Sequence, residues 1–309
     1  MSEMLLELDS LRRSFGKRVA VDNLSLSIRR GEIFGLLGPN GAGKSTAFHL
    51  LTGLLAADSG QVIFDGVALS PTDPRLRRRL GVVFQEPSLD DKLTGLENLQ
   101  LGAALYGLRG RHAAKRIAEM SALVELTDRL HDPVEQYSGG MKRRLEIARV
   151  LLHRPDMLIL DEPGRGIDQP TQRRIWEQLI ELNRREKLTV LLTTHQPDEA
   201  EHCHRLAILD EGRLIACDSP DALKRCVGGD VIALESEHLD QIWPIVQRDF
   251  STARRIENQI VVEVPRGHEV IPRLVEKLPA GVLRSVELRR PTLGDVFLHL
   301  TGRGLGATA

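Results

Sequence analysis

A glycine-rich loop between a strand pattern and a helix pattern constrains this chain more than any other feature. The stretch GPNGAGKST, residues 38–46, follows the apolar run IFGLL and opens the helical pattern AFHLLTGLL. It has the P-loop spacing of Gly38, four residues, then Gly43, Lys44 and Ser45, in the strand–loop–helix setting that this motif requires. Glycines let successive backbone N–H groups point at phosphates, and the helix N-terminus adds positive partial charge. The loop therefore predicts a nucleotide site.

Two side chains of this loop have specific predicted roles. Lys44 reaches the β- and γ-phosphates of the nucleotide, and the Ser45 hydroxyl coordinates Mg²⁺. We expect the whole loop to contact the nucleotide, through Gly38, Pro39, Asn40, Gly41, Ala42, Gly43, Lys44, Ser45 and Thr46.

A second strand ends in two adjacent acids, Asp161 and Glu162, after the apolar run MLIL. A nucleotide site of this kind needs a second strand that carries a carboxylate, and Asp161 can hold the Mg²⁺ shell there. Glu162 is one residue further on, so its side chain points another way and can reach a water aimed at the γ-phosphate. Together with the P-loop, the two acids predict hydrolysis of a nucleoside triphosphate.

Length and composition exclude several classes of protein. The 309 residues exceed one ordinary domain, and a hydrophobic content of 41% suffices for real cores. The net charge of −1 gives no overall attraction to nucleic acid, which we do not expect as a partner. The basic run KRR at residues 142–144 is interpreted as a local, solvated helix face.

Three features of the sequence indicate the cellular compartment of the protein. Cys203, Cys217 and Cys226 are an odd and sparse set, which fits a reducing compartment rather than a disulfide framework. The N-terminal MSEMLLELDS lacks the basic segment of a signal peptide. No window reaches 18 apolar residues, so if the function concerns a membrane, we expect another chain to supply the span.

The order of strand and helix patterns predicts an α/β fold with two domains. Strand-like runs come first, residues 95–155 are mostly helical, and strands then alternate with helices from residue 157 onward. Such alternation with continuous apolar strands is typical of a parallel sheet covered on both faces. A seam falls at CVGGD, residues 226–230, and the β-α-β-α-β order after it predicts a small α+β domain.

The stretch YSGGMKRRLEIARVLL, residues 137–152, completes a pattern that resembles the ATP-binding subunits of ABC transporters. The resemblance covers residues 4–226. The stretch is similar to the signature motif of that family, with Tyr137 for the usual Leu and Met141 for the usual Gln. It implies that Ser138, Gly139 and Gly140 contact phosphate.

The same resemblance implies roles for residues of other motifs. Gln85 in GVVFQEPSL fits the Q-loop, which bonds Mg²⁺ and contacts the membrane subunit, and His195 in LLTTH fits the switch histidine on the γ-phosphate. Phe15 stands where the family places an aromatic that stacks on adenine. Asp168 is a nucleotide-site residue at the end of the D-loop, the stretch GRGID at residues 164–168. Taken singly, a glutamine, a histidine or a phenylalanine is a surface, structural or core residue. Their joint order and spacing favour the functional interpretation.

Two separated segments, GVVFQEPSLDDKLTGLENL and PTLGDVFLHLTGR, are similar to the exporter branch that includes the daunorubicin-type drug-resistance ATPases. This resemblance implies an ABC ATPase domain at residues 1–227, with a mostly parallel core sheet, an antiparallel β subdomain and a helical subdomain at about residues 90–155. It also implies a small α+β accessory domain at residues 228–309. We expect that domain to support dimerisation or to regulate pairing with the membrane subunit.

The resemblance further implies an ATPase that binds ATP and Mg²⁺ between the two subunits of a homodimer. Glu162 polarises the attacking water, while Lys44, His195 and the partner's Ser138 stabilise charge on the γ-phosphate. Such a dimer drives a separate integral membrane permease as an exporter, from a peripheral position at the cytoplasmic face of the membrane.

Two alternatives belong to other functional classes. One is a soluble ABC ATPase in a non-transport role, although such proteins usually carry two ATPase domains or long insertions. The other is a non-catalytic, nucleotide-gated regulator, against which the intact Glu162 and His195 argue. A six-span membrane protein in the adjacent reading frame would favour transport.

The sequence departs from the family in its D-loop, GRGID. Gly164 stands in place of the usual Thr, and Ile167 in place of the usual Leu. Because glycine is smaller and more flexible, we expect the departure to affect the positioning of this loop rather than the chemistry of the acids before it.

Overall fold

The computed structural model describes residues 3–68, 73–256 and 258–305. The chain forms two compact units, Met1–Leu214 and Ile215–Ala309, and the division falls within strand β10 (Arg213–Asp218). The boundary expected after residue 227 lies further along the chain than this division. Helix α8 (Pro220–Arg225) lies between the two positions, and it packs against α11 (Leu293–Thr301) of the second unit.

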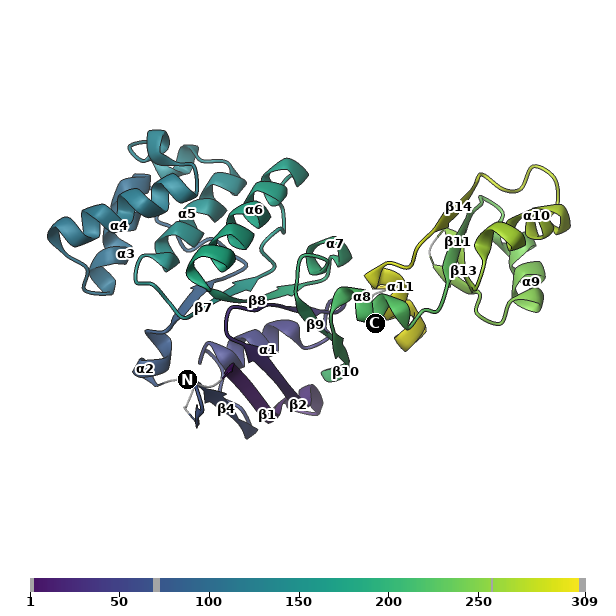
Figure 1. Cartoon of the computed structure of the whole chain (residues 1–309), viewed down its shortest axis with the longest axis horizontal. Helices are drawn as coiled ribbons and strands as arrows, with labels where there is room; N and C mark the ends of the chain where they lie inside the picture. Colours follow the sequence, from purple (N-terminus) through teal and green to yellow (C-terminus); the bar gives the residue numbers. More distant parts are fainter. Residues whose placement is uncertain (1–2, 69–72, 257, 306–309) are drawn as a thin grey trace. The chain divides into compact units, whose positions relative to one another are not determined.

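A six-stranded sheet forms the centre of the first unit, in the order β10-β9-β3-β8-β7-β6. The pairs β9–β3, β3–β8, β8–β7 and β7–β6 are parallel. Helix α6 packs on one face of β7 and β8 and helix α1 on the other (Figure 1), so every residue of β3 and β7 is buried. This two-sided cover explains the continuous apolar runs of the sequence. The elements of this layer are β3 (Ile33–Leu37), α1 (Lys44–Leu51), α2 (Pro74–Arg77), β6 (Leu80–Val83), β7 (Met157–Asp161), α6 (Gln169–Glu186), β8 (Thr189–Thr194), α7 (Pro197–Ala200) and β9 (Arg205–Asp210).

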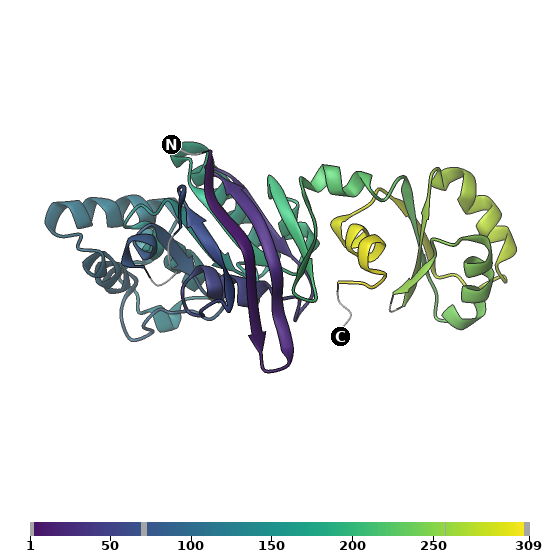
Figure 2. The same cartoon turned by 90° about the horizontal axis from the view of Figure 1, so that it is seen from below.

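An antiparallel sheet in the order β2-β1-β4-β5 forms a second layer of this unit. The first two strands make the long hairpin seen in Figure 2. Its last pair is Phe15 opposite Arg18, so these two residues lie at the hairpin tip. The strands are β1 (Met4–Phe15), β2 (Arg18–Arg29), β4 (Ser59–Phe64) and β5 (Val67–Ala68).

A helical subdomain is inserted between β6 and β7. Helix α3 begins at a capping box formed by Thr94 and Glu97, which satisfies backbone N–H groups at the helix start. The apolar faces of its helices share one core, to which Leu99, Ile117 and Leu145 contribute. The helices are α3 (Gly95–Leu105), α4 (Gly110–Leu123) and α5 (Gly139–Leu151), with 3-10 turns η1 (Thr127–Arg129) and η2 (Val134–Gln136). The predicted α/β fold with these three parts is confirmed.

The second unit has an antiparallel sheet in the order β12-β13-β11-β14 with helices on both faces. Helices α9 and α10 pack on one face, against Ile232, Leu234 and Val262. Helix α11 lies on the other face (Figures 1 and 2), where Nδ1 of His299 is 2.8 Å from Oε2 of Glu263. The elements are β11 (Asp230–Glu235), α9 (Leu239–Asp249), β12 (Arg254–Ile256), β13 (Gln259–Val264), α10 (Gly267–Lys277), β14 (Ser285–Arg289) and α11. Among the described residues of the whole chain, no helix has the length and apolar character needed to cross a membrane.

Candidate nucleotide site

The candidate site is a pocket of about 430 Å³ at the carboxyl ends of the core strands. Lys44 follows β3, Gln85 follows β6, Glu162 follows β7 and His195 follows β8. Because parallel strands end at one edge of the sheet, residues far apart in the sequence converge there. The pocket is lined by Phe15, Arg18, Ala20, Asn40, Gly41, Gly43, Lys44, Ser45, Thr46, Gln85, Glu162 and Arg165.

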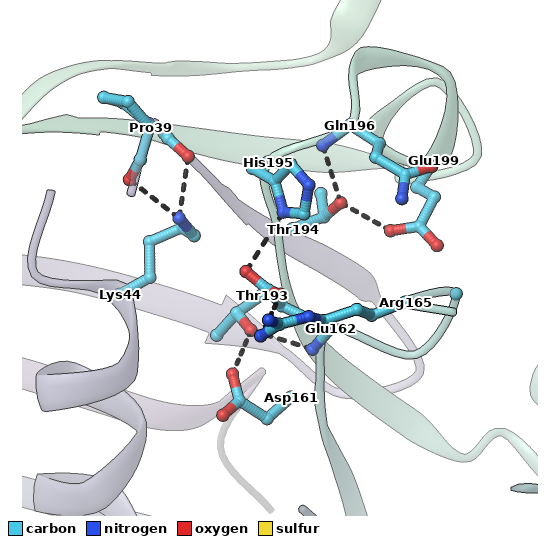
Figure 3. A network of polar contacts seen from close by, with 12 residues as sticks. Pro39, Lys44, Asp161, Glu162, Arg165, Thr193, Thr194, His195, Gln196 and Glu199 are labelled. Atoms are coloured by element: carbon cyan, nitrogen blue, oxygen red, sulfur yellow. Dashed lines mark hydrogen bonds and ion pairs between the residues drawn. The ribbon is translucent and has the colours of Figure 1, made fainter. Parts of the chain in front are cut away.

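The P-loop connects β3 to α1, and Lys44 is the first residue of that helix. Its side chain is buried, and its ammonium group donates to the carbonyl oxygens of Gly38 and Pro39 at 2.7 and 2.9 Å (Figure 3). Burial lowers the pKa of Lys44, whereas the nearby carboxylates of Glu162 and Asp161 act to raise it. The loop therefore holds a cation among backbone groups at the start of a helix, which is an arrangement suited to phosphate.

Two glycines of the P-loop are required by close packing. Gly43 has a φ of 99°, and a Cβ atom at this residue would lie 2.4 Å from the carbonyl oxygen of Ala20 in β2. A Cβ atom at Gly38 would lie 2.3 Å from the carbonyl oxygen of Leu209 in β9. Only glycine fits such approaches, so both ends of the loop are held against neighbouring strands.

The two acids at the end of β7 are fixed by one threonine. The hydroxyl of Thr193 in β8 donates to the Asp161 carboxylate, and the same hydroxyl accepts the backbone N–H of Glu162 at 3.1 Å (Figure 3). Glu162 has a φ of 44°, a left-handed conformation that costs a non-glycine residue about 1–3 kcal/mol. The two carboxylates have different neighbours, because Asp161 accepts from the Thr193 hydroxyl whereas Glu162 faces His195.

The Glu162 carboxylate has a different neighbour on each oxygen. Nδ1 of His195 lies 3.1 Å from Oε1, and Nη1 of Arg165 lies 3.7 Å from Oε2. Glu162 is only 9% exposed, whereas His195 is 36% and Arg165 58% exposed. The acid is therefore largely covered, while both of its neighbours remain open to a ligand.

Phe15 forms an aromatic platform at the pocket. Phe15 is about half exposed, and the Arg13 guanidinium carbon lies 5.1 Å from the centroid of its ring. Arg13 is itself held by Asp58 through a hydrogen bond of 2.9 Å. An aromatic face supported in this way suits the stacking of a nucleotide base.

Ser45, Gln85 and Asp161 supply oxygen atoms of the kind that Mg²⁺ prefers. Ser45 and Gln85 line the pocket, and Asp161 lies at the end of β7 with its carboxylate oriented by Thr193. Hydroxyl, amide and carboxylate oxygens are hard donors, and nucleotide phosphates commonly complete a magnesium shell. The donor set therefore fits this ion.

Several predicted residues are not among those that line this pocket: Gly38, Pro39, Ala42, Asp161 and His195 border it, through the P-loop backbone or through contacts with Thr193 and Glu162. Two further sets lie outside it. The hydroxyl of Ser138 caps α5 by accepting the N–H of Met141 at 3.2 Å, and Ser138 is exposed. Asp168 caps α6 by accepting the N–H of Thr171 at 3.1 Å, which holds the pKa of Asp168 below its usual value. In the part of the chain that the structure describes, neither Asp168 nor residues 138–140 line the pocket formed with the P-loop.

The interpretation of residues 142–144 as a solvated face is wrong. Arg143 is 6% exposed, because its guanidinium donates to the carbonyl oxygen of Asp161 at 2.7 Å and to that of Phe84. Arg144 is also largely covered, and it donates to the carbonyl oxygen of Val124 at 2.9 Å. Hydrogen bonds to backbone carbonyls compensate the burial of these charged groups.

Sequence reasoning missed three polar residues of this site. Thr193 orients both acids, Arg165 faces Glu162, and Arg18 lines the pocket from the hairpin tip. The position of Thr193 at the end of an apolar strand, next to the neighbouring acid-bearing strand, was the available signal for that residue. The contacts of Arg18 and Arg165 depend on how the hairpin and the D-loop fold.

The D-loop departure at Gly164 makes room for two polar side chains. A Cβ atom at Gly164 would lie 2.0 Å from Oε1 of Glu199 and 2.4 Å from Nε2 of Gln172. Gln172 donates to the Gly164 carbonyl oxygen at 2.6 Å, and Glu199 accepts from the Thr194 hydroxyl. Burial raises the pKa of Glu199, whose Oε1 has no well-aligned hydrogen-bond donor. The space left by the missing side chain is thus filled from α6 and α7.

Two sequence families match the chain in succession. The ABC transporter family matches residues 21–165, and the C-terminal domain of DrrA1-3-like ATP-binding proteins matches residues 219–301. The linearmycin resistance ATP-binding protein LnrL of Bacillus subtilis is 36% identical over 310 residues, which cover 97% of this chain and 99% of that protein. This chain belongs to the ATP-binding proteins of ABC transporters. The predicted resemblance to daunorubicin-type exporter ATPases is therefore confirmed.

Two further ABC transporter ATP-binding proteins are similar over nearly the same length. The Nod factor export ATP-binding protein I of Paraburkholderia xenovorans is 38% identical and covers 98% of this chain and 99% of its own. The daunorubicin resistance ATP-binding protein DrrA2 of Streptomyces coeruleorubidus is 36% identical, with coverages of 95% and 94%. Both names refer to export or resistance.

Solved ABC cassettes have the fold of the first unit. The cbiO1 protein of Clostridium perfringens, part of the ABC transporter complex cbiONQ, has a TM-score of 0.68 and 28% identity, covering 73% of this chain and 94% of its own. The dimeric bacterial cassette MJ0796 has a TM-score of 0.64 and 29% identity, with coverages of 70% and 98%. MJ0796 is also known in a post-hydrolysis state bound to ADP and Pi. The present chain is accordingly an ATP-binding ABC ATPase.

Proposed function

We propose that this ABC ATPase is the energy-coupling subunit of an exporter, in which magnesium-dependent ATP hydrolysis in a homodimer drives a separate membrane permease. The observation that supports this proposal most directly is the convergence of Lys44 with the Glu162–His195 pair at one edge of the core sheet. A regulator that only binds nucleotide has no need of a covered carboxylate paired with a histidine beside the P-loop.

Binding of ATP uses the P-loop and the hairpin tip. The backbone of residues 38–46 and the Lys44 ammonium hold the phosphates, and the exposed face of Phe15 stacks on adenine. Ser45, Gln85 and Asp161 are the residues that would hold Mg²⁺. When bound, this ion neutralises charge on the β- and γ-phosphates.

Hydrolysis uses the Glu162 carboxylate as the base for the attacking water. The bonds from its backbone N–H to Thr193 fix its position, and His195 on Oε1 fixes its orientation. His195 is open enough to contact the γ-phosphate as well. A positioned base of this kind contributes about 10²–10⁴-fold to the rate.

A homodimer explains the residues that lie outside their own pocket. Ser138 and Gly139 are exposed at the start of α5 and Gly140 follows them, so that bare N–H groups and a hydroxyl suited to phosphate stand at this helix end. In the proposed dimer they contact the nucleotide held by the P-loop of the partner, and Asp168 lies at the same interface. Each of the two sites then needs both subunits.

The proposed permease is a separate integral membrane protein, which places the ATPase at the cytoplasmic face of the membrane. The export and resistance names of the relatives support this assignment. The test is co-expression with a six-span protein encoded in the adjacent reading frame. We expect the ATPase to enter the membrane fraction and to co-purify with that protein only when both are present. An ATPase that hydrolyses ATP but stays outside the membrane fraction with this protein would instead favour a non-transport role.

We propose residues 228–309 as an accessory domain that supports self-association or pairing with the permease. Its own sheet and apolar core support independent packing, and the match at residues 219–301 supports a separate domain. No nucleotide-site residue predicted from the sequence falls inside it.

A further inference from the structure

Arg165 is a basic residue of the pocket to which the mechanism above gives no role. The D-loop makes a tight turn, in which the N–H of Arg165 donates to the carbonyl oxygen of Glu162 at 3.1 Å. Gly166, with a φ of 70°, continues the turn. The turn returns the Arg165 side chain toward Glu162 (Figure 3), so that it lines the same pocket as Lys44 and Ser45.

The ion pair between Arg165 and Glu162 is weak. Nη1 is 3.7 Å from Oε2, which is too long for a hydrogen bond, and the arginine side chain is 58% exposed. A pair at this distance with an exposed guanidinium contributes little to stability, because water reaches the arginine and screens its charge. The guanidinium is therefore free to exchange this carboxylate for an anion that binds it better.

A nucleoside triphosphate is such an anion. Guanidinium groups bind phosphate with two parallel N–H donors, which makes the contact stronger and more directional than a single ion pair. The γ-phosphate also brings negative charge close to the Glu162 carboxylate, where a cation offsets the repulsion. Lys44 is buried within the P-loop, whereas Arg165 is an exposed cation placed beside the acid.

We propose that Arg165 is a catalytic arginine that binds the γ-phosphate in the pocket of its own chain, in exchange for Glu162. The exchange frees Oε2 of Glu162 for the attacking water, while His195 stays on Oε1. The inference rests on the proposed function, because it assigns a further residue to the same hydrolysis.

The test compares three variants by affinity and by rate. Arg165→Ala removes the guanidinium, and Arg165→Lys keeps the charge without the planar fork. Arg174→Ala is the matched control, because Arg174 is 62% exposed and makes a similar pair of 3.8 Å with Glu125, outside the pocket. Affinities for ADP and for a non-hydrolysable ATP analogue are measured at concentrations where light scattering shows a monomer, so that only contacts within one chain count. Turnover is measured separately on the full chain with magnesium.

We expect Arg165→Ala to weaken binding of the ATP analogue about tenfold to hundredfold, the range for one charge-assisted contact, and to leave ADP affinity within about twofold. Its kcat should fall by a similar factor, Arg165→Lys should lie between Arg165→Ala and wild type, and Arg174→Ala should match wild type. An unchanged ratio of ATP-analogue to ADP affinity, or a raised kcat, overturns the inference. If the wild type hydrolyses ATP but Arg165→Ala leaves the ratio of ATP-analogue to ADP affinity unchanged, only the role of Arg165 is refuted. If the wild type does not hydrolyse ATP, the proposed function itself is refuted.

Discussion

Arg143 donates a hydrogen bond of 2.7 Å to the backbone carbonyl oxygen of Asp161. The same guanidinium reaches the carbonyl oxygen of Phe84, the residue before Gln85, and lies 3.5 Å from the buried carboxylate of Glu146. Helix α5, which begins at the signature segment, is thereby tied to the ends of β6 and β7. The segment proposed to face the partner and the acids proposed to act on the nucleotide are held by one side chain.

Replacing Arg143 with Met should destabilise the first unit by about 3–5 kcal/mol, the loss typical of a buried charge left without its partner. Glu146 is 1% exposed and would lose its cation. Urea unfolding monitored by circular dichroism measures the loss. Arg173→Met, at an exposed position of α6, is the control and should change stability by less than about 0.5 kcal/mol. Equal stabilities of the two variants would show that Arg143 does not tie α5 to the strand ends.

Lys44→Ala should weaken nucleotide binding about tenfold to hundredfold, because it removes the charge that pairs with the phosphates. Titration with a fluorescent nucleotide measures this affinity. Lys115→Ala on α4, where the side chain is 78% exposed, provides the control and should bind normally. An affinity of Lys44→Ala equal to that of the control would mean that the nucleotide does not occupy the P-loop as proposed.

Gly164→Thr should cost about 1–3 kcal/mol of stability, the usual penalty of overpacking. Its side chain would collide with Glu199 and Gln172, which already fill the space. Adding Glu199→Ala removes one of the colliding groups, so the double variant should lose less stability than the sum of the two single variants. Urea denaturation of the wild type, the two single variants and the double variant completes this double-mutant cycle. Strictly additive losses would show that Glu199 does not occupy the space that the missing side chain leaves.

The site residues that belong to sequence motifs could be predicted, because each motif has a strong local pattern. Lys44, Glu162 and His195 each follow an apolar strand, and the ends of parallel strands converge at one edge. Arg143 was not predictable, because an arginine in a basic run reads as a solvated residue until the carbonyl oxygens that surround it are known. The approach of Gly164 to Glu199 brings the D-loop against helix α7, and it depends on how α6 and α7 pack.

The capping of α11 makes the second unit sensitive to acid. Burial raises the pKa of Asp295, but the ion pair with Arg289 and the hydrogen bond from the N–H of Thr292 outweigh it, so the pKa lies below its usual value. A depressed carboxyl pKa contributes stability above the unfolded-state value of about 3.9 and loses it as the pH falls through the folded-state value. Stability from Asp295 is therefore present at neutral pH and lost in acid.

Asp295→Asn should accordingly destabilise the second unit by about 1–3 kcal/mol at pH 7, and its deficit relative to wild type should shrink below about pH 4. Trp243 in α9 reports unfolding of this unit by fluorescence when Trp176 of α6 is replaced by Phe. Asp240→Asn, 89% exposed, is the control. Nucleotide affinity should be unchanged while self-association or transport weakens. A deficit that does not vary with pH would contradict the assigned ion pair, and loss of nucleotide affinity would contradict an independent accessory domain.

The central claim, that Glu162 is the base for ATP hydrolysis, is tested most directly by Glu162→Gln. The amide keeps the shape of the side chain but cannot take a proton, so turnover should fall by about 10²–10⁴-fold while ATP binding is preserved. The variant should collect as an ATP-bound dimer on a sizing column, and Glu181→Gln, at an exposed position of α6, should hydrolyse ATP like the wild type. A wild-type hydrolysis rate in Glu162→Gln would contradict the account.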